Sequence, residues 1–309
     1  MPSLLTKDQA RYALAVVDHG LSHVCGCSIQ KKGEGAALPF ENALLELLLS
    51  GWAKATKKST KEAAALLAAS DAALTTEEVG NLLKRIGNAI KTTLGPSVSP
   101  GLANLMLGSY KSPRNKVMRR FHMSVKWDQV DDAAVSWLHD HHMYWIESFY
   151  DKQISGGVAS TVAEGLQQGL GRVDIGKMLK TYFDDYPGIP VKPQNYWEGT
   201  AANAMNRSRG FGLLHGYEVA GVRTLKLAVV DDERTSAICH ALIGTEIPLN
   251  VAVYQRDRLM EAENPEDVKT IAPWLRVEDV AGKSNAEKIM LGIGMPPYHF
   301  HCRTGIIAA

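Results

Sequence analysis

Two short stretches near the C-terminal end of the sequence concentrate side chains that bind metals or form ion pairs. The first contains Asp232 and Cys239, and the second contains His299, Cys302 and Arg303. Cysteine thiolates and histidine imidazoles are preferred ligands of zinc, whereas an arginine guanidinium pairs with a carboxylate through two parallel hydrogen bonds. Residues this far apart act together only if the fold joins them, so the pattern predicts that the two stretches meet.

Two chemistries are consistent with these residues. In the first, Cys239, His299 and Cys302 bind a zinc ion, with His240 or His301 as a fourth ligand. In the second, the cysteines pack as small apolar side chains, no cofactor is needed, and neighbouring polar residues form a hydrogen-bonded clasp. The expected clasp residues are Asp232, Arg234, Thr235 and Arg303.

The two stretches together resemble the C-terminal pattern of the phage head-morphogenesis family, the minor head proteins similar to protein F of phage Mu. That pattern reads roughly D-x-R-T-C-x-x-C-x-x-L-x-G, followed by P-P-x-H-P-x-C-R-C. This sequence departs from it at Ser236, Phe300 and Thr304, which stand where the family has Cys, Pro and Cys. The residues in register are Asp232, Arg234, Thr235, Cys239, Leu242, Gly244, Pro296, Pro297, His299, Cys302 and Arg303.

The resemblance implies a structural protein of the virion head, which is made in the host cytoplasm and has no catalytic residues. Its implied partners are the portal protein, the major capsid protein or a scaffold protein, with phage DNA as a further candidate. Its implied roles are head assembly and assistance with DNA packaging or ejection. In the fuller family pattern, four sulfur and nitrogen donors could close a tetrahedral zinc site, and only part of that set is present here.

Two other functions are alternatives to the assembly role. A metal-dependent hydrolase or nuclease would use Cys239, His299, His301 and Cys302, with Glu233 as a general base. Zinc deaminases need an H-x-E followed by P-C-x-x-C, which this sequence lacks. An auxiliary DNA-binding protein is the other alternative, although the sequence shows no helix-turn-helix or aromatic strand motif.

A basic window lies in the middle of the chain, with no acidic residue between its first and last cations. Phe121 and Trp127 are interleaved with it. A solvated helix face is the ordinary interpretation, and contact with DNA phosphates or an acidic partner is the functional one. The cations are Lys111, Arg114, Lys116, Arg119, Arg120 and Lys126.

Composition and length favour a globular protein without a membrane anchor. The chain has 309 residues, a formal charge of +1, 45% hydrophobic residues and four cysteines. A charge near zero gives no global signature of nucleic-acid binding, and four irregularly spaced cysteines do not indicate a disulfide framework. The N-terminus lacks the apolar region of a signal peptide, and the apolar block 44–52 is too short to span a bilayer.

The hydrophobic periodicity predicts a mainly helical α+β fold with a small C-terminal sheet. We expect a helical N-terminal domain over 1–110, a basic and aromatic helical connection over 111–145, and a head-morphogenesis-like domain over 146–309 with an insertion at 250–295.

In the N-terminal part the expected features are a first helix from Thr6 to Val17, a His23, Cys25 and Cys27 group packed without metal, a capped helix from Thr75 that ends at Gly95-Pro96, and a linker over 95–115. The resemblance implies paired helices over 154–183, which a turn at Tyr186 to Gly188 closes. A helix over 195–219 and strands over 223–230 and 245–249 are expected next, followed by an irregular segment over 250–295 with room for a helix.

Overall fold

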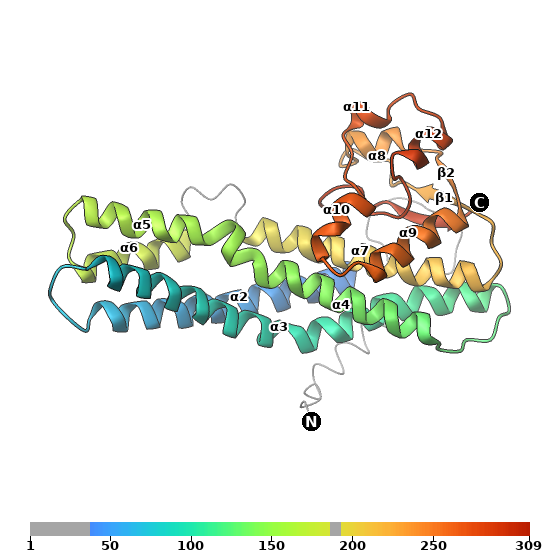
Figure 1. Cartoon of the computed structure of the whole chain (residues 1–309). Helices are drawn as coiled ribbons and strands as arrows, with labels where there is room; N and C mark the ends of the chain where they lie inside the picture. Colours follow the sequence, from blue (N-terminus) through green and yellow to red (C-terminus); the bar gives the residue numbers. More distant parts are fainter. Residues whose placement is uncertain (1–37, 186–192) are drawn as a thin grey trace. The chain divides into compact units, whose positions relative to one another are not determined.

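The computed structural model describes residues 38–185 and 193–309. These residues are mainly helical with one small antiparallel sheet, which confirms the predicted fold class (Figure 1). No helix among them is both long and apolar enough to cross a bilayer. The expected first helix, the His23, Cys25 and Cys27 group and the turn at 186–188 lie outside the described residues.

The helices that precede the sheet are α2 (Leu38–Leu67), α3 (Thr76–Arg120), α4 (Gln129–Phe149), a π-helical turn (Tyr150–Ile154), α5 (Ser155–Gln167), α6 (Arg172–Asp185) and α7 (Pro193–Val219). The chain forms two compact units whose segments alternate along the sequence. Unit 1 takes residues up to Leu45, then Gly101–His141 and Glu198–Ala309, and unit 2 takes Glu46–Pro100 and His142–Trp197.

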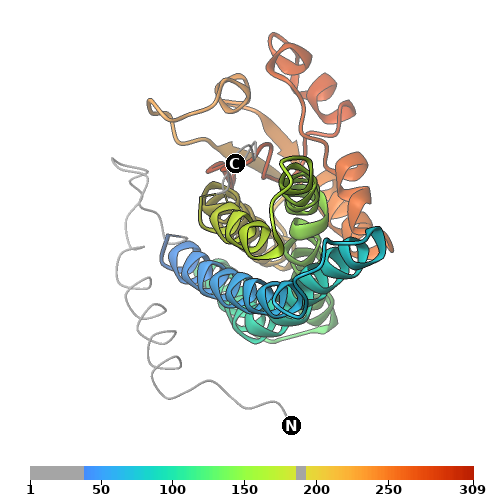
Figure 2. The same ribbon diagram turned by 90° about the vertical axis from the view of Figure 1, so that its left-hand side faces the viewer.

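In unit 2, α2 lies beside the first half of α3 (Figure 2). A Cβ added to Gly51 would fall 2.8 Å from the Val98 side chain, so the close approach of the two helices depends on this glycine. The predicted cap of α3 is confirmed, because the Thr75 backbone N–H donates to Glu78 and the Glu78 N–H donates to the Thr75 hydroxyl. Arg172 of α6 also donates to Glu78 at 2.8 Å.

Helix α3 continues through Pro96, Pro100 and Pro113, so the predicted helix end at Gly95 and the linker over 95–115 are wrong. A proline inside a helix costs about 3 kcal/mol because it removes a backbone donor and crowds the preceding turn. Pro96 and Pro100 lie on the exposed side, and the opposite face buries a row of apolar side chains worth about 1.5–3 kcal/mol each. That row is Leu94, Val98, Leu102 and Met106.

The paired helices expected over 154–183 are confirmed as α5 and α6, which pack against each other in unit 2 (Figure 1). Their contact uses small residues on α5. Gly157 lies against the Tyr182 ring, and Gly165 lies against Ile175, at distances that leave no room for a larger residue without movement.

The sheet of unit 1 has three antiparallel strands in the order β2-β1-β3. Strands β1 (Thr224–Ala228) and β2 (Glu246–Pro248) lie within the two predicted strands, and α7 closely matches the predicted helix. Leu225 pairs with Ile247 on one side of β1. The third strand, β3 (Gly305–Ala308), is not among the predicted elements, and it pairs with β1 through Leu227 and Ile306.

The segment over 250–295, expected to be irregular with room for a helix, is instead a series of short helices in unit 1. Gln255 ties them together: its side chain donates to the backbone of Ile271 and Gly292 and accepts from Met295. Helices this short are marginal alone, and the Gln255 bonds add to the burial of apolar side chains such as Leu259 and Val280. The helices of this segment are α9 (Leu249–Glu261), a 3-10 turn (Pro265–Asp267), α10 (Val268–Ile271), α11 (Val277–Val280) and α12 (Asn285–Met290). One further short helix, α8 (Ala237–Ala241), lies between β1 and β2.

Candidate functional site

Three of the predicted metal-binding residues lie together in unit 1, and we call them the Cys-His cluster. The ligand atoms of Cys239, His299 and Cys302 are within 4.8 Å of one another. Cys239 Sγ lies 3.2 Å from His299 Nε2 and 3.9 Å from Cys302 Sγ, and both cysteines are buried. Cys239 belongs to α8, and the other two residues follow the Pro296-Pro297 turn.

Two hydroxyl groups complete the cluster. Ser236 Oγ lies 2.8 Å from His299 Nε2, and Thr304 Oγ1 donates to Cys239 Sγ at 3.1 Å. Ser236 also caps α8 by accepting from the Cys239 backbone N–H. These two residues stand at the positions where the family that the motif resembles has cysteines. Hydroxyl groups that form hydrogen bonds therefore occupy the places of two thiols.

The cluster perturbs its own titratable groups. Hydrogen bonds from Cys302, His299, Ser236 and Thr304 lower the pKa of the Cys239 thiol, although burial opposes this shift. The same contact with Cys239, together with burial, raises the pKa of Cys302. Burial lowers the pKa of His299, but the hydrogen bonds with Cys239 and the Phe300 backbone, together with the charge of Cys239, outweigh burial and the net shift is upward. Cys239 is therefore the more acidic of the two thiols.

The cluster supplies three of the four ligands that a closed structural zinc site requires. His299 Nδ1 lies 2.6 Å from the Phe300 carbonyl oxygen, which places a proton on Nδ1 and leaves Nε2 as the acceptor. The two candidate fourth ligands lie elsewhere: His240 is exposed and pairs with Asp231, and His301 is exposed. The donor set therefore does not fit a closed tetrahedral site.

Replacing both hydroxyl residues with cysteine, Ser236→Cys/Thr304→Cys, is expected to create such a site. Both side chains already point at Cys239 or His299, so the new thiolates would complete the tetrahedron. We expect one zinc per chain by elemental analysis and a melting temperature several degrees higher, because metal binding adds to folding free energy.

The unmodified chain is expected to hold much less than one zinc and to melt at the same temperature with and without a chelator. The matched control is Ser236→Ala/Thr304→Val, which removes the hydroxyls without adding ligands and should gain no zinc. A full equivalent of zinc in the unmodified chain, with a lower melting temperature after chelation, would show that three ligands suffice.

The predicted clasp residues meet beside the cluster. Arg303 donates to both carboxylate oxygens of Asp232, at 2.8 Å from Nη1 to Oδ2 and in a shorter contact from Nη2. Hydrogen bonds from Arg303, Arg234 and Thr235 hold the pKa of Asp232 well below its usual range, although burial opposes the shift. Thr235 shares its hydroxyl with Asp232 and Val230, whereas Arg234 contributes only its backbone N–H.

Replacing Arg303 with Ala is expected to lower the melting temperature by a few degrees, since the change removes a bidentate ion pair that joins two distant stretches. Limited proteolysis should cut the C-terminal region faster. Arg234→Ala is the matched control, because its side chain is exposed and its backbone bond remains. Equal melting temperatures and equal cleavage rates for the two variants would refute the clasp.

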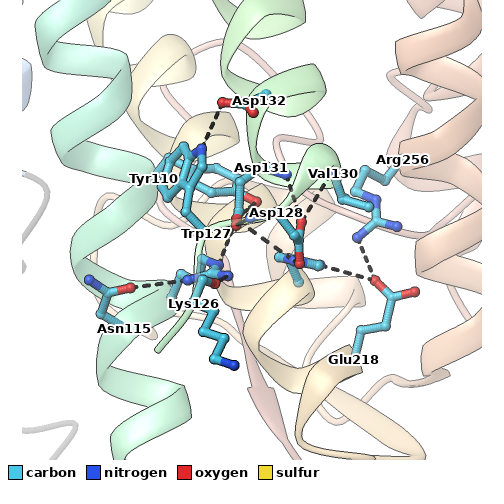
Figure 3. Close-up of polar contacts among 12 residues, drawn as sticks. Tyr110, Asn115, Lys126, Trp127, Asp128, Val130, Asp131, Asp132, Glu218 and Arg256 are labelled. Carbon is cyan, nitrogen blue, oxygen red and sulfur yellow. Dashed lines mark hydrogen bonds and ion pairs between the residues drawn. The ribbon is translucent and has the colours of Figure 1, made fainter. Parts of the chain in front are cut away.

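A second polar cluster in unit 1 surrounds His215 and is not anticipated by any sequence motif. Figure 3 shows its members Asp128, Asp131, Glu218 and Arg256. His215 Nε2 lies 3.0 Å from Asp128 Oδ2, and Nδ1 lies 3.4 Å from Glu218 Oε2. Arg256 of α9 donates to the same Glu218 oxygen at 2.7 Å. These contacts therefore connect the residue just before α4, the end of α7 and α9 through a continuous series of charged and polar side chains.

Asp131 is the buried end of this cluster. It is 0% exposed, and its Oδ1 lies 2.6 Å from Arg114 Nε and accepts from Tyr110 at 2.8 Å. The Arg114 Nε contact is an ion pair without hydrogen-bond alignment. Asp128, Asp131 and His215 are close enough to hold a metal ion, but Arg114 already neutralises Asp131. The group is thus an ion-pair network.

The network predicts a pH dependence of stability. Burial lowers the pKa of His215, but hydrogen bonds with Glu218 and Asp128 outweigh it and the net shift is upward. A raised folded pKa stabilises the fold fully below the unfolded value of about 6.5, and this contribution disappears as the pH rises through the folded value. The free energy of unfolding should therefore fall above about pH 6.5, by at most about 1.4 kcal/mol per pH unit.

Urea unfolding between pH 6 and 9 tests this prediction. His215→Gln should flatten the decline, because it removes the titrating group while keeping a polar side chain. His240→Gln is the control, since His240 is exposed on α8 and contacts the exposed Asp231 rather than a buried ion-pair network. An unchanged slope in His215→Gln would show that another group causes the pH dependence.

The six cations of the basic window do not form one surface. Arg114 is 1% exposed and binds Asp131 and the Lys126 carbonyl oxygen, so the prediction that it contacts DNA or a partner is wrong. The others are exposed at the end of α3 or in the loop before α4. These are Lys111, Lys116, Arg119, Arg120 and Lys126.

A pocket of about 380 Å³ in unit 1 lies between α4 and the segment after α9. Trp137, Asp140 and Glu263 are among its lining residues, and the Cys-His cluster contributes none.

Neither a family model, nor a curated protein, nor a solved structure matches this chain. The family resemblance accordingly rests on the register of the C-terminal motif residues.

Proposed function

We propose that this chain is a minor head protein of a tailed phage, a structural component that joins the procapsid during assembly. The observation that supports this best is the meeting of the two motif stretches. Asp232 pairs with Arg303, and Cys239 contacts both His299 and Cys302. If these residues matched the family pattern only by chance, there would be no reason for the two stretches to lie in contact. Contact between them is expected if they belong to one folded module.

The burial of the cluster favours a structural role over catalysis. Cys239 is 3% exposed and Cys302 is 2% exposed, so a substrate has little access to either sulfur. Glu233, the base that a hydrolase would require, is exposed and outside the cluster. A metal-dependent hydrolase or nuclease is thus the less supported alternative, because such enzymes keep an open metal position facing a cleft.

The proposed partners are the portal protein and the major capsid protein, with a scaffold protein as a third candidate. In this proposal the protein is located in the virion head after assembly in the host cytoplasm. The C-terminal module, held by the clasp and the Cys-His cluster, would provide a rigid docking surface. It requires no cofactor, since hydrogen bonds and ion pairs close it.

Co-expression with the portal and major capsid proteins of the same phage tests the proposal. We expect the chain to sediment with procapsids in a sucrose gradient at a fixed low copy number, and omission of each partner in turn should identify the contact. Arg234→Ala, which leaves the clasp intact, should co-sediment equally. A chain that stays at the top of the gradient with all partners present would refute the assembly role. A hydrolytic activity that is lost in Cys239→Ser would favour the enzyme instead.

A further inference from the structure

The end of α3 and the loop that follows form an exposed basic surface, which we call the α3-end surface. On the helix, Lys111 and Arg119 lie about two turns apart in one column, with Asn115 between them. Lys116 and Arg120 lie about one turn apart in the adjacent column. Arg114, Val117 and Met118 occupy the opposite, buried face. All four helical cations therefore project from the same outer half of α3.

The spacing of these cations suits a regular polyanion. Residues 111–120 rise roughly 14 Å along the helix axis, and a DNA strand presents a phosphate about every 3.4 Å of duplex axis. Lys126, in the following loop, adds a fifth exposed cation. These five cations, which we call the basic stripe, therefore extend far enough to face several phosphates of one DNA strand.

The acidic residues just after the loop are bonded to other side chains. Asp131 is paired with Arg114, and Asp128 lies against His215. Asp132 accepts from the Trp127 indole N–H at 2.7 Å. These three carboxylates therefore already have partners outside the α3-end surface, and the five cations of that surface are exposed.

The loop adds apolar side chains that are exposed to water. Phe121, Met123 and Val125 are each 37–41% exposed at alternate positions. The loop has a defined shape, because Arg114 donates to the Lys126 carbonyl and the Trp127 ring packs edge-on against Tyr110 at 5.9 Å. Exposed apolar residues on a fixed loop beside a basic stripe indicate a binding surface.

We infer that the α3-end surface binds DNA without sequence preference, through phosphate contacts from the stripe and apolar contacts from the loop. Three of its five cations are lysines, which are depleted in protein–protein interfaces, so a polyanion fits better than an acidic protein. Aromatic and apolar side chains such as Phe121 and Met123 pack against bases or sugars without reading sequence. This inference stands on the surface alone and does not depend on the proposed assembly role.

Fluorescence anisotropy with the full chain and a labelled 30-base-pair duplex of random sequence tests the inference. We expect affinity to fall steeply with salt, with a slope near −0.9 per phosphate contact. Arg119→Gln/Arg120→Gln/Lys126→Gln should weaken binding at least tenfold at low salt and reduce that slope by about 2–3. Phe121→Ser/Met123→Ser should weaken binding with little change in slope.

The matched control is Lys54→Gln/Lys57→Gln/Lys58→Gln, which removes the same charge from exposed positions of α2. It should leave the affinity within about twofold, and circular dichroism should confirm that each variant is folded. Absent DNA binding, or equal losses in the two triple variants, would overturn the inference. Tighter binding to polyglutamate than to DNA would overturn it in favour of an acidic protein partner. The assay uses no capsid component, so its failure is separate from that of the assembly proposal.

Discussion

Replacing Arg114 with Met is expected to lower the free energy of unfolding by about 3–5 kcal/mol, the largest loss we expect from a single substitution in this chain. The guanidinium and the Asp131 carboxylate are 1% and 0% exposed, so the variant leaves a buried carboxylate without its arginine, with the Tyr110 hydroxyl and the more distant His215 ring as its side-chain neighbours. It also removes the bond that holds the Lys126 carbonyl. Urea unfolding followed by circular dichroism measures the loss.

Arg119→Met is the matched control, because it removes the same kind of charge from an exposed position of the same helix and should change stability by no more than about 0.5 kcal/mol. Arg114→Met/Asp131→Leu should recover part of the loss, since an apolar pair avoids the unpaired charge. An Arg114→Met variant as stable as Arg119→Met would show that the ion pair makes no net contribution.

The second large effect is expected for Asn206→Ala, which should cost about 2–4 kcal/mol. The Asn206 side chain, on α7, donates to the backbone oxygens of Cys302 at 2.8 Å and Thr304 at 3.1 Å. Both acceptors belong to buried residues, so the substitution leaves two carbonyl groups without this donor. It should also loosen β3, which begins one residue after Thr304.

Asn203→Ala provides the comparison, because Asn203 is on the same helix and its buried Oδ1 accepts no hydrogen bond in the described structure. We expect it to cost less than about 1 kcal/mol. Hydrogen exchange should show faster exchange of the β3 amides in Asn206→Ala only. Equal stability and equal exchange in the two variants would contradict the role assigned to Asn206.

Local signals identified the elements that depend on local interactions. The Thr75 and Glu78 pair predicted the start of α3 because a capping box involves only four neighbouring residues. The apolar run before Asp232 predicted β1. The paired helices α5 and α6 were expected over 154–183 from the resemblance to the family, whose motif follows such a pair. The sequence also located the candidate site residues on two stretches, one with Asp232 and Cys239 and the other with His299, Cys302 and Arg303. It left a metal site and a hydrogen-bonded clasp as alternatives.

Tertiary packing decided what local preference could not. Helix α3 passes Pro96 and Pro100 because the buried opposite face offsets their cost, and no local rule includes that face. Strand β3 is too short to be recognised by pattern and exists through pairing with β1 and the Asn206 bonds. After β2, Gln255 of α9 likewise bonds to the end of α10 at Ile271 and to the turn after α12 at Gly292, residues far from it in the sequence.

The residue types by themselves determined that this chain is mainly helical and which side chains could bind metal, DNA or one another. Only the tertiary structure separated buried charges from exposed ones. Arg114 and Arg119 look alike in a basic window, yet one lies against Asp131 and the other faces water. The physical reason is that a charge costs little in water and several kcal/mol in the interior without a partner, and the sequence does not show where a partner lies.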